Sequence, residues 1–111
     1  MNWTISQDGT ASVVVLGSEM SIQQAAGFYQ AVLPLAAGGG SVRVNAHAAK
    51  TVHSSIMQIL YALSQAVLDF GVIDASADFA AAEARVGISL ARGHETETSS
   101  DRLAGTEVQR A

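Results

Sequence analysis

Three adjacent polar residues, His53, Ser54 and Ser55, stand just before a run of apolar residues at helical spacing. A serine in this place is a typical N-cap, because its hydroxyl accepts a hydrogen bond from an otherwise unpaired N–H of the first helical turn. A helix N-terminus also carries a partial positive charge and tolerates an anion. A phosphoryl group on either serine would bring roughly two negative charges to that end. The residues therefore fit two interpretations, a plain helix cap and a phosphorylation switch.

Other chemistry finds little support in the spacing of the polar residues. His53 beside Ser54 or Ser55 lacks a Gly-x-Ser-x-Gly turn and a third triad member, and neighbouring residues at a helix start are expected to point in different directions. His47 and His53 have no third ligand at a spacing diagnostic of a metal site. Residues 38–40 are glycines that follow a predicted helix and precede a strand, the reverse of a phosphate-binding loop. We therefore expect no enzyme activity, no cofactor and no metal.

The composition restricts the class of protein. The chain has 111 residues, enough for one domain with a hydrophobic core, and it has no cysteine for a disulfide or a thiolate metal site. Its formal net charge of −4 argues against binding to nucleic acid. No apolar run approaches the roughly 20 residues that span a bilayer, and residues 1–8 lack the features of a secretory signal. We expect a cytoplasmic protein without direct membrane insertion.

Hydrophobic periodicity divides the chain into seven main elements. Strands are predicted at residues 3–6, 11–16, 41–45 and 72–75. Helices are predicted behind serine caps at residues 22–37, 54–70 and 78–86. Asp8-Gly9 suits a tight hairpin turn, Ser21 with Gln24 forms a capping-box pattern, and Gly71 suits the C-cap of the second helix. A small further strand or a turn is expected at residues 87–90.

Helices between successive strands predict crossover connections and a mostly parallel sheet, to which the N-terminal hairpin adds an antiparallel edge. We therefore expect an α/β fold with a four- to five-stranded mixed sheet, in the order strand, strand, helix, strand, helix, strand, helix. So few strands should leave the helices mainly on one face. We assign residues 1–91 to this domain. Residues 92–111 are polar and aperiodic, and we expect them to form a disordered tail.

Three stretches of the chain together follow the pattern of one family of regulatory domains. The strand Val42-Arg43-Val44-Asn45 leads, after a loop, to Thr51-Val52-His53-Ser54-Ser55-Ile56-Met57-Gln58-Ile59-Leu60. Residues 16–20 follow the second strand, and residues 71–79 contain the last strand and the start of the final helix. These stretches resemble the strand and Asp-Ser-Ser-Gly-Leu-Gln-like helix start, the Leu-x-Gly-x-Leu stretch and the last strand of the STAS domain (sulfate transporter and anti-sigma factor antagonist). The resemblance covers roughly residues 3–90 and implies a STAS-like fold.

The resemblance implies a small protein-binding module. Stand-alone members of this family bind a partner protein, often an anti-sigma-type Ser/Thr kinase, and phosphorylation at the start of the second helix switches them off. By residue matching the acceptor is Ser55, with Ser54 as its neighbour. The chain departs from the family at His53, Ile56 and Asn45, which replace an acidic residue, a glycine and an aspartate. Divergent members without the acidic residue resemble docking subunits of lipid or ABC transporters or of chemotaxis arrays.

We expect residues 46–53 and the first turns of the second helix to form the surface that contacts a partner. The residues expected there are Asn45, His47, Lys50, His53, Met57, Gln58 and Tyr61. An unmodified serine would permit docking, and a phosphoserine would block it. The alternative is a constitutive docking subunit that is not phosphorylated. The exposed edge of a short sheet also leaves a homodimer open as an interpretation.

Overall fold

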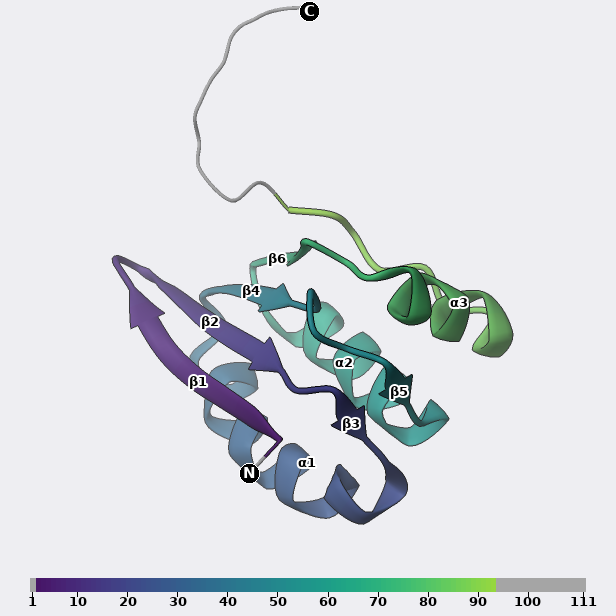
Figure 1. Ribbon diagram of the computed structural model, residues 1–111. Coiled ribbons are helices and arrows are strands. Elements are labelled where there is room, and N and C mark those ends of the chain that lie inside the picture. The colour runs from purple at the N-terminus through teal and green to yellow at the C-terminus, as the bar shows by residue number, and fades with distance from the viewer. Residues whose placement is uncertain (1, 94–111) are drawn as a thin grey trace, which may run out of the picture.

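The structure is a computed structural model that describes residues 2–93. Its elements, in chain order, are β1 (Trp3–Asp8), β2 (Ala11–Leu16), β3 (Glu19–Met20), α1 (Ile22–Gly38), β4 (Ser41–Asn45), β5 (Thr51–Val52), α2 (Ser54–Ala66), β6 (Asp69–Ile73) and α3 (Ala77–Val86). Four strands form one sheet in the order β1-β2-β4-β6, and β3 pairs with β5 beside it (Figure 1). β2, β4 and β6 are parallel, whereas β1 is antiparallel to β2. The predicted α/β class and mixed sheet are confirmed.

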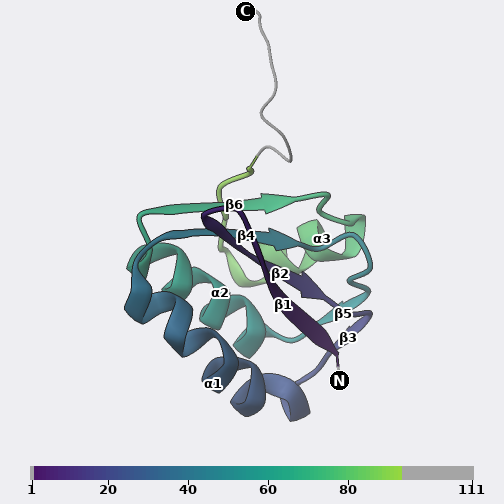
Figure 2. The same cartoon turned by 90° about the vertical axis from the view of Figure 1, so that its left-hand side faces the viewer.

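The helices gather on one side of the sheet. α1 and α2 pack side by side against it, and α3 packs against α2 and β5 (Figure 2). Within residues 2–93, no helix lies over the opposite face of the sheet. This arrangement places the N-termini of the helices near the carboxyl ends of the parallel strands, because each helix follows the strand that leads into it.

The hydrophobic core lies between the sheet and the helix layer. Alternate residues of the central strands point into it and are at most 1% exposed, namely Val14, Leu16, Val42 and Val44. Arg43 lies between two of these valines and faces the other way, as the alternation predicts. The helices contribute the fully buried side chains of Phe28, Ile56, Leu60 and Phe79. Burying one such side chain is worth about 1.5–3 kcal/mol, so these contacts hold the helices on the sheet.

The first helix follows its local sequence signals closely. The Gln24 side chain accepts a hydrogen bond from the Ser21 N–H at 2.8 Å, which is one half of the predicted capping box. The helix ends at Gly38, and Gly39 takes the left-handed conformation with φ of 67°. Trp3 of β1 packs edge-on against Phe28, with ring centroids 5.4 Å apart, and so fixes the first strand over the helix.

The second helix is shorter than predicted. α2 ends at Ala66 instead of Phe70, and Gly71 lies inside β6 instead of capping the helix. The Leu68 N–H donates to the Gly39 carbonyl at 3.0 Å, which draws the chain out of the helix and aligns it with β4. The same apolar residues that continue the helical stripe also suit a strand, and pairing with β4 decides between the two.

Two short strands replace predicted loops. β3 and β5 contain two residues each and pair in parallel, with Glu19 opposite Thr51 and Met20 opposite Val52. Segments of this length carry no periodicity, so they were not predicted. β1 also extends two residues further than expected, to Asp8.

The chain returns along β6 after α3. The Val72 N–H donates to the Ala91 carbonyl at 2.8 Å, and the Gly93 N–H donates to the Val72 carbonyl at 2.9 Å. Arg92, expected as the first residue of the tail, therefore belongs to the domain. Of the two alternatives predicted for residues 87–90, a small strand or a turn, the structure has a turn at Gly87, and the bridge to β6 forms at Arg92.

Gly71 makes this return possible by its lack of a side chain. A Cβ atom at Gly71 would lie 2.5 Å from the Cα atom of Gly93, which is closer than real Cβ contacts. The glycine is thus required by a close approach of two backbones, not by a helix end. The disorder predicted for residues 94–111 concerns residues that lie outside the described part of the chain.

Candidate functional site

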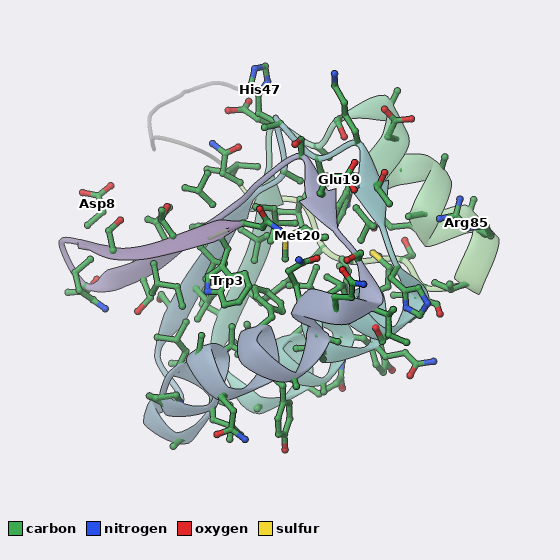
Figure 3. The ribbon with its side chains drawn as sticks, turned by 60° about the horizontal axis from the view of Figure 1, so that its bottom comes forward. Trp3, Asp8, Glu19, Met20, His47 and Arg85 are labelled. Carbon is green, nitrogen blue, oxygen red and sulfur yellow. The ribbon has the colours of Figure 1, made fainter. Side chains whose placement is uncertain are left out.

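The predicted contact surface lies at the carboxyl ends of the parallel strands. The edge loop, which we define as residues 46–53, leaves β4, includes β5 and enters α2. In open α/β sheets this end is where binding sites collect. Figure 3 shows His47 projecting from the edge loop away from the domain, whereas Met20 of the adjacent β3 points into it. The edge loop therefore exposes polar side chains, while side chains that point into the domain hold the pair of β3 and β5 in place.

Hydrogen bonds hold the edge loop to two other segments. The N–H groups of Lys50 and Thr51 both donate to the Ser18 carbonyl, at 3.1 and 2.9 Å. The Ser76 hydroxyl donates to the Ala49 carbonyl at 2.6 Å while it accepts a backbone N–H as the N-cap of α3. Because these bonds come from both sides, the backbone of the loop is ordered before any partner binds.

His53, and not Ser54 or Ser55, is the N-cap of α2. Its Nδ1 accepts a hydrogen bond from the Ser55 N–H at 3.1 Å and lies 2.9 Å from Ser55 Oγ. An N–H can only donate, so Nδ1 carries no proton in this arrangement and also accepts from the Ser55 hydroxyl. The expectation that these neighbouring side chains point apart is therefore wrong for His53 and Ser55. The imidazole nitrogen fills the acceptor position that a Ser or Asp oxygen usually fills at a cap.

The two serines differ in their availability. Ser54 is the first residue of α2 and is exposed. Ser55 is half-buried, and its hydroxyl is held by His53. The Ser54 hydroxyl is therefore accessible to another molecule without a conformational change. The Ser55 side chain has to rotate away from His53 before another molecule can react with it.

The other residues predicted to contact a partner fall into three groups. Four are exposed, namely His47, Lys50, Gln58 and Tyr61. Asn45 is half-buried, and its Oδ1 accepts from the His47 N–H at 2.9 Å, so it shapes the start of the edge loop. Met57 is 0% exposed, and its prediction as a contact residue is wrong. It belongs to the core because α2 packs against the sheet, α1 and α3, which cover more of the helix than one narrow stripe.

Sequence reasoning missed two charged residues at the same edge. Arg85 of α3, labelled in Figure 3, donates to the Val52 carbonyl at 3.3 Å, directly before His53. Glu19 of β3 lies opposite Thr51, whose hydroxyl is 3.5 Å from its carboxylate. A basic residue in the last turn of α3 is visible in the sequence, but its position depends on the packing of α3 against β5.

Comparison of the chain with models of known protein families finds no match, and comparison with curated proteins finds no relative. The STAS resemblance therefore rests on the residues quoted above and stays a prediction. In the part of the chain that the structure describes, no three His, Asp or Glu side chains gather in a way that could hold a metal ion. None of the helices within residues 2–93 has the length and apolar character needed to cross a membrane.

We expect His53→Ala to lower the free energy of unfolding by about 1 kcal/mol, because the Ser55 N–H loses its acceptor. His53→Asp restores an acceptor and places a negative charge at the helix start, so its stability should match or exceed that of the wild type. Urea titration followed by circular dichroism measures both. Ser54→Ala, at the exposed neighbour, is the control and should change little. Equal stability of the Ala and Asp variants would contradict the cap assigned to His53.

Proposed function

We propose that this chain is a small cytoplasmic protein-binding module of the STAS type, with the edge loop and the first turns of α2 as its contact surface. The observation that carries the proposal is the exposed hydroxyl of Ser54 at a helix start, beside a loop fixed by hydrogen bonds. A surface that is ordered in advance loses little conformational entropy on binding. The expected partner is an anti-sigma-type Ser/Thr kinase.

The proposed switch is transfer of a phosphoryl group from the ATP of that kinase to the serine Oγ. The Oγ–P bond forms, the bond between the γ-phosphorus and the bridging oxygen breaks, and ADP leaves. For Ser55, the adjacent Nδ1 of His53 is an acceptor for the hydroxyl proton. The helix N-terminus favours the new charge by about 0.3–1 kcal/mol. The docked partner then meets roughly two additional negative charges and is released.

We expect incubation with the partner kinase and ATP to add one phosphoryl group to the chain. Intact-mass spectrometry measures it. If Ser55 is the acceptor, Ser55→Ala should abolish the addition. If the more exposed hydroxyl of Ser54 is the acceptor, Ser54→Ala should abolish it. The double variant should take up no phosphoryl group in either case. Incorporation that survives in the double variant would move the switch to another residue and contradict the proposal.

A second function, a constitutive docking subunit of a lipid or ABC transporter or of a chemotaxis array, is favoured by one observation. The Ser55 hydroxyl is half-buried and held by His53, as expected for a residue that only completes a helix cap.

Ser55→Asp separates the two functions. Under the switch we expect Ser55→Asp to weaken binding to the co-purifying partner at least tenfold, because a permanent negative charge stands where the partner docks. Ser55→Asn, of the same shape without the charge, should bind nearly as well as the wild type. Isothermal titration calorimetry measures all three. Unchanged binding by Ser55→Asp would favour the constitutive subunit.

A further inference from the structure

The two longest helices of the structure contain no charged residue. α1 has 17 residues and α2 has 13, and neither includes Asp, Glu, Lys or Arg. Every charged residue within residues 2–93 lies on another element or on a loop, at Asp8, Glu19, Arg43, Lys50, Asp69, Asp74, Asp78, Glu83, Arg85 and Arg92. Solvent-facing sides of helices ordinarily carry charged residues. The outward surface of α1 and α2, here called the neutral helix face, is therefore unlike the rest of the molecule.

Large apolar side chains are exposed on this face. Ile22, Tyr29 and Leu33 of α1 are 61, 47 and 38% exposed, and Tyr61 of α2 is 46% exposed. The three α1 residues recur at steps of seven and four, which places them along one side of the helix. Figures 1 and 2 show α1 and α2 side by side in one layer on the sheet. The face is thus continuous across two helices.

The distribution of charge indicates what can cover the neutral helix face. Two copies of a chain with a net charge of −4 repel each other, and contact through a surface without charges keeps that repulsion smallest. An anionic membrane is recognised by Lys and Arg beside the apolar residues, and neither helix has them. A partner selected by complementary charge would likewise find nothing to pair with.

We infer that the neutral helix face is a homodimer interface, in which α1 and α2 of one copy pack on α1 and α2 of a second copy about a two-fold axis. Such pairing needs only a surface that complements itself. The sheet edges were the other surfaces considered for a homodimer. Residues 91–93 already bond to β6 at one edge, and pairing through β1 at the other edge would leave the apolar side chains of the neutral helix face uncovered. The inference rests on the surface of α1 and α2 and does not depend on the proposed function, although the two surfaces share the first turns of α2, with Tyr61.

The size of the face sets the expected strength of the dimer. A helix of 17 residues is about 25 Å long, and two packed helices are about 20 Å wide, which gives roughly 500 Å² on each copy. Stable interfaces bury about 800 Å² per partner. The interface is therefore small, and we expect association in the micromolar range rather than an obligate dimer.

Sedimentation velocity of the full chain, from low-micromolar to millimolar concentration, tests this inference. We expect the average mass to rise from 11.4 kDa toward twice that value, and added salt to favour the dimer by screening the net charge. Leu33→Glu should raise the dissociation constant at least tenfold. Val15→Glu is the matched control, since Val15 is 36% exposed against 38% for Leu33 and lies on the opposite face of the sheet. It should leave the dimer intact.

Several results would overturn the inference. They are a wild type that stays monomeric at millimolar concentration, a dimer weakened by salt, and a dimer that Val15→Glu dissociates but Leu33→Glu does not. If circular dichroism shows that Leu33→Glu does not fold, Tyr29→Lys at the more exposed position takes its place. A monomer that binds vesicles of phosphatidylcholine with phosphatidylglycerol would assign the face to a membrane surface instead.

Discussion

Replacement of Met57 by alanine is expected to lower the free energy of unfolding by about 2–5 kcal/mol. The Met57 side chain is 0% exposed and belongs to the cluster of buried residues between the sheet and the helices. Alanine would leave a cavity there, because the surrounding side chains relax only in part. A typical domain is stable by about 5–15 kcal/mol, so a loss of this size takes a large share of it. Urea denaturation followed by circular dichroism measures the effect.

The adjacent Gln58 is the control for this prediction. Gln58 is exposed, so Gln58→Ala should change the stability by less than about 0.5 kcal/mol. From the sequence alone, both residues were predicted to contact a partner. In the structure Met57 is buried, whereas Gln58 is exposed. Met57→Ala should impair binding only through loss of folded protein, whereas Gln58→Ala can impair binding at unchanged stability. A Met57→Ala variant with the denaturation midpoint of the wild type would contradict the burial of this side chain.

Local signals were enough to predict the elements that nonlocal contacts do not modify. The bounds of β2 and β4 agree with the sequence prediction, because short apolar segments rich in valine suit strands and a glycine or a polar residue marks each of their ends. Ser76 caps α3 as predicted, since its hydroxyl accepts from the Phe79 N–H within the first turn. The end of α2 was wrong because the deciding contact, between Leu68 and Gly39, joins residues far apart in the sequence.

The start of the second helix was predicted, but the hydrogen bonds around it were not. The start of α2 follows from the change of pattern at residues 53–55, which is local. The identity of the cap does not follow, because histidine is not among the residues that ordinarily cap helices, and its role depends on the rotation of one imidazole ring. The bonds from Ser76 and Arg85 to the edge loop depend on where α3 packs, and a single sequence carries no signal for that.

The second large effect is expected at the ion pair between Glu83 and Arg92. Glu83 is 7% exposed, and its Oε2 accepts from the Leu90 N–H at 2.9 Å and from the Arg92 guanidinium at 3.0 Å. Arg92→Ala would leave the buried carboxylate without its counter-charge, so we expect a loss of about 2–4 kcal/mol in the free energy of unfolding. Arg43→Ala is the control. It breaks an ion pair with Asp69, whose side chain is 52% exposed, and should cost less than about 1 kcal/mol.

The pH dependence of the stability shows whether the charge of Arg92 causes the loss expected for Arg92→Ala. Burial raises the pKa of the Glu83 carboxyl, but the hydrogen bonds from Arg92 and Leu90 and the charge of Arg92 outweigh it and hold the pKa below its ordinary value of 4.5. The folded chain thus binds this proton less tightly than the unfolded chain, so the stabilisation is present above pH 4.5 and is lost as the pH falls through the lowered pKa.

The stability difference between the wild type and Arg92→Ala should therefore be constant near neutral pH and shrink in acid, because a protonated Glu83 needs no counter-charge. The pKa of Asp69 is also lowered, by its hydrogen bond from Arg43, but Asp69 is the same in both chains and cancels from the difference. Urea titrations of both chains at several pH values measure this stability difference. A difference that persists in acid would mean that Arg92 acts by packing on the Phe79 ring, whose centroid is 6.0 Å from the guanidinium carbon, and not by its charge.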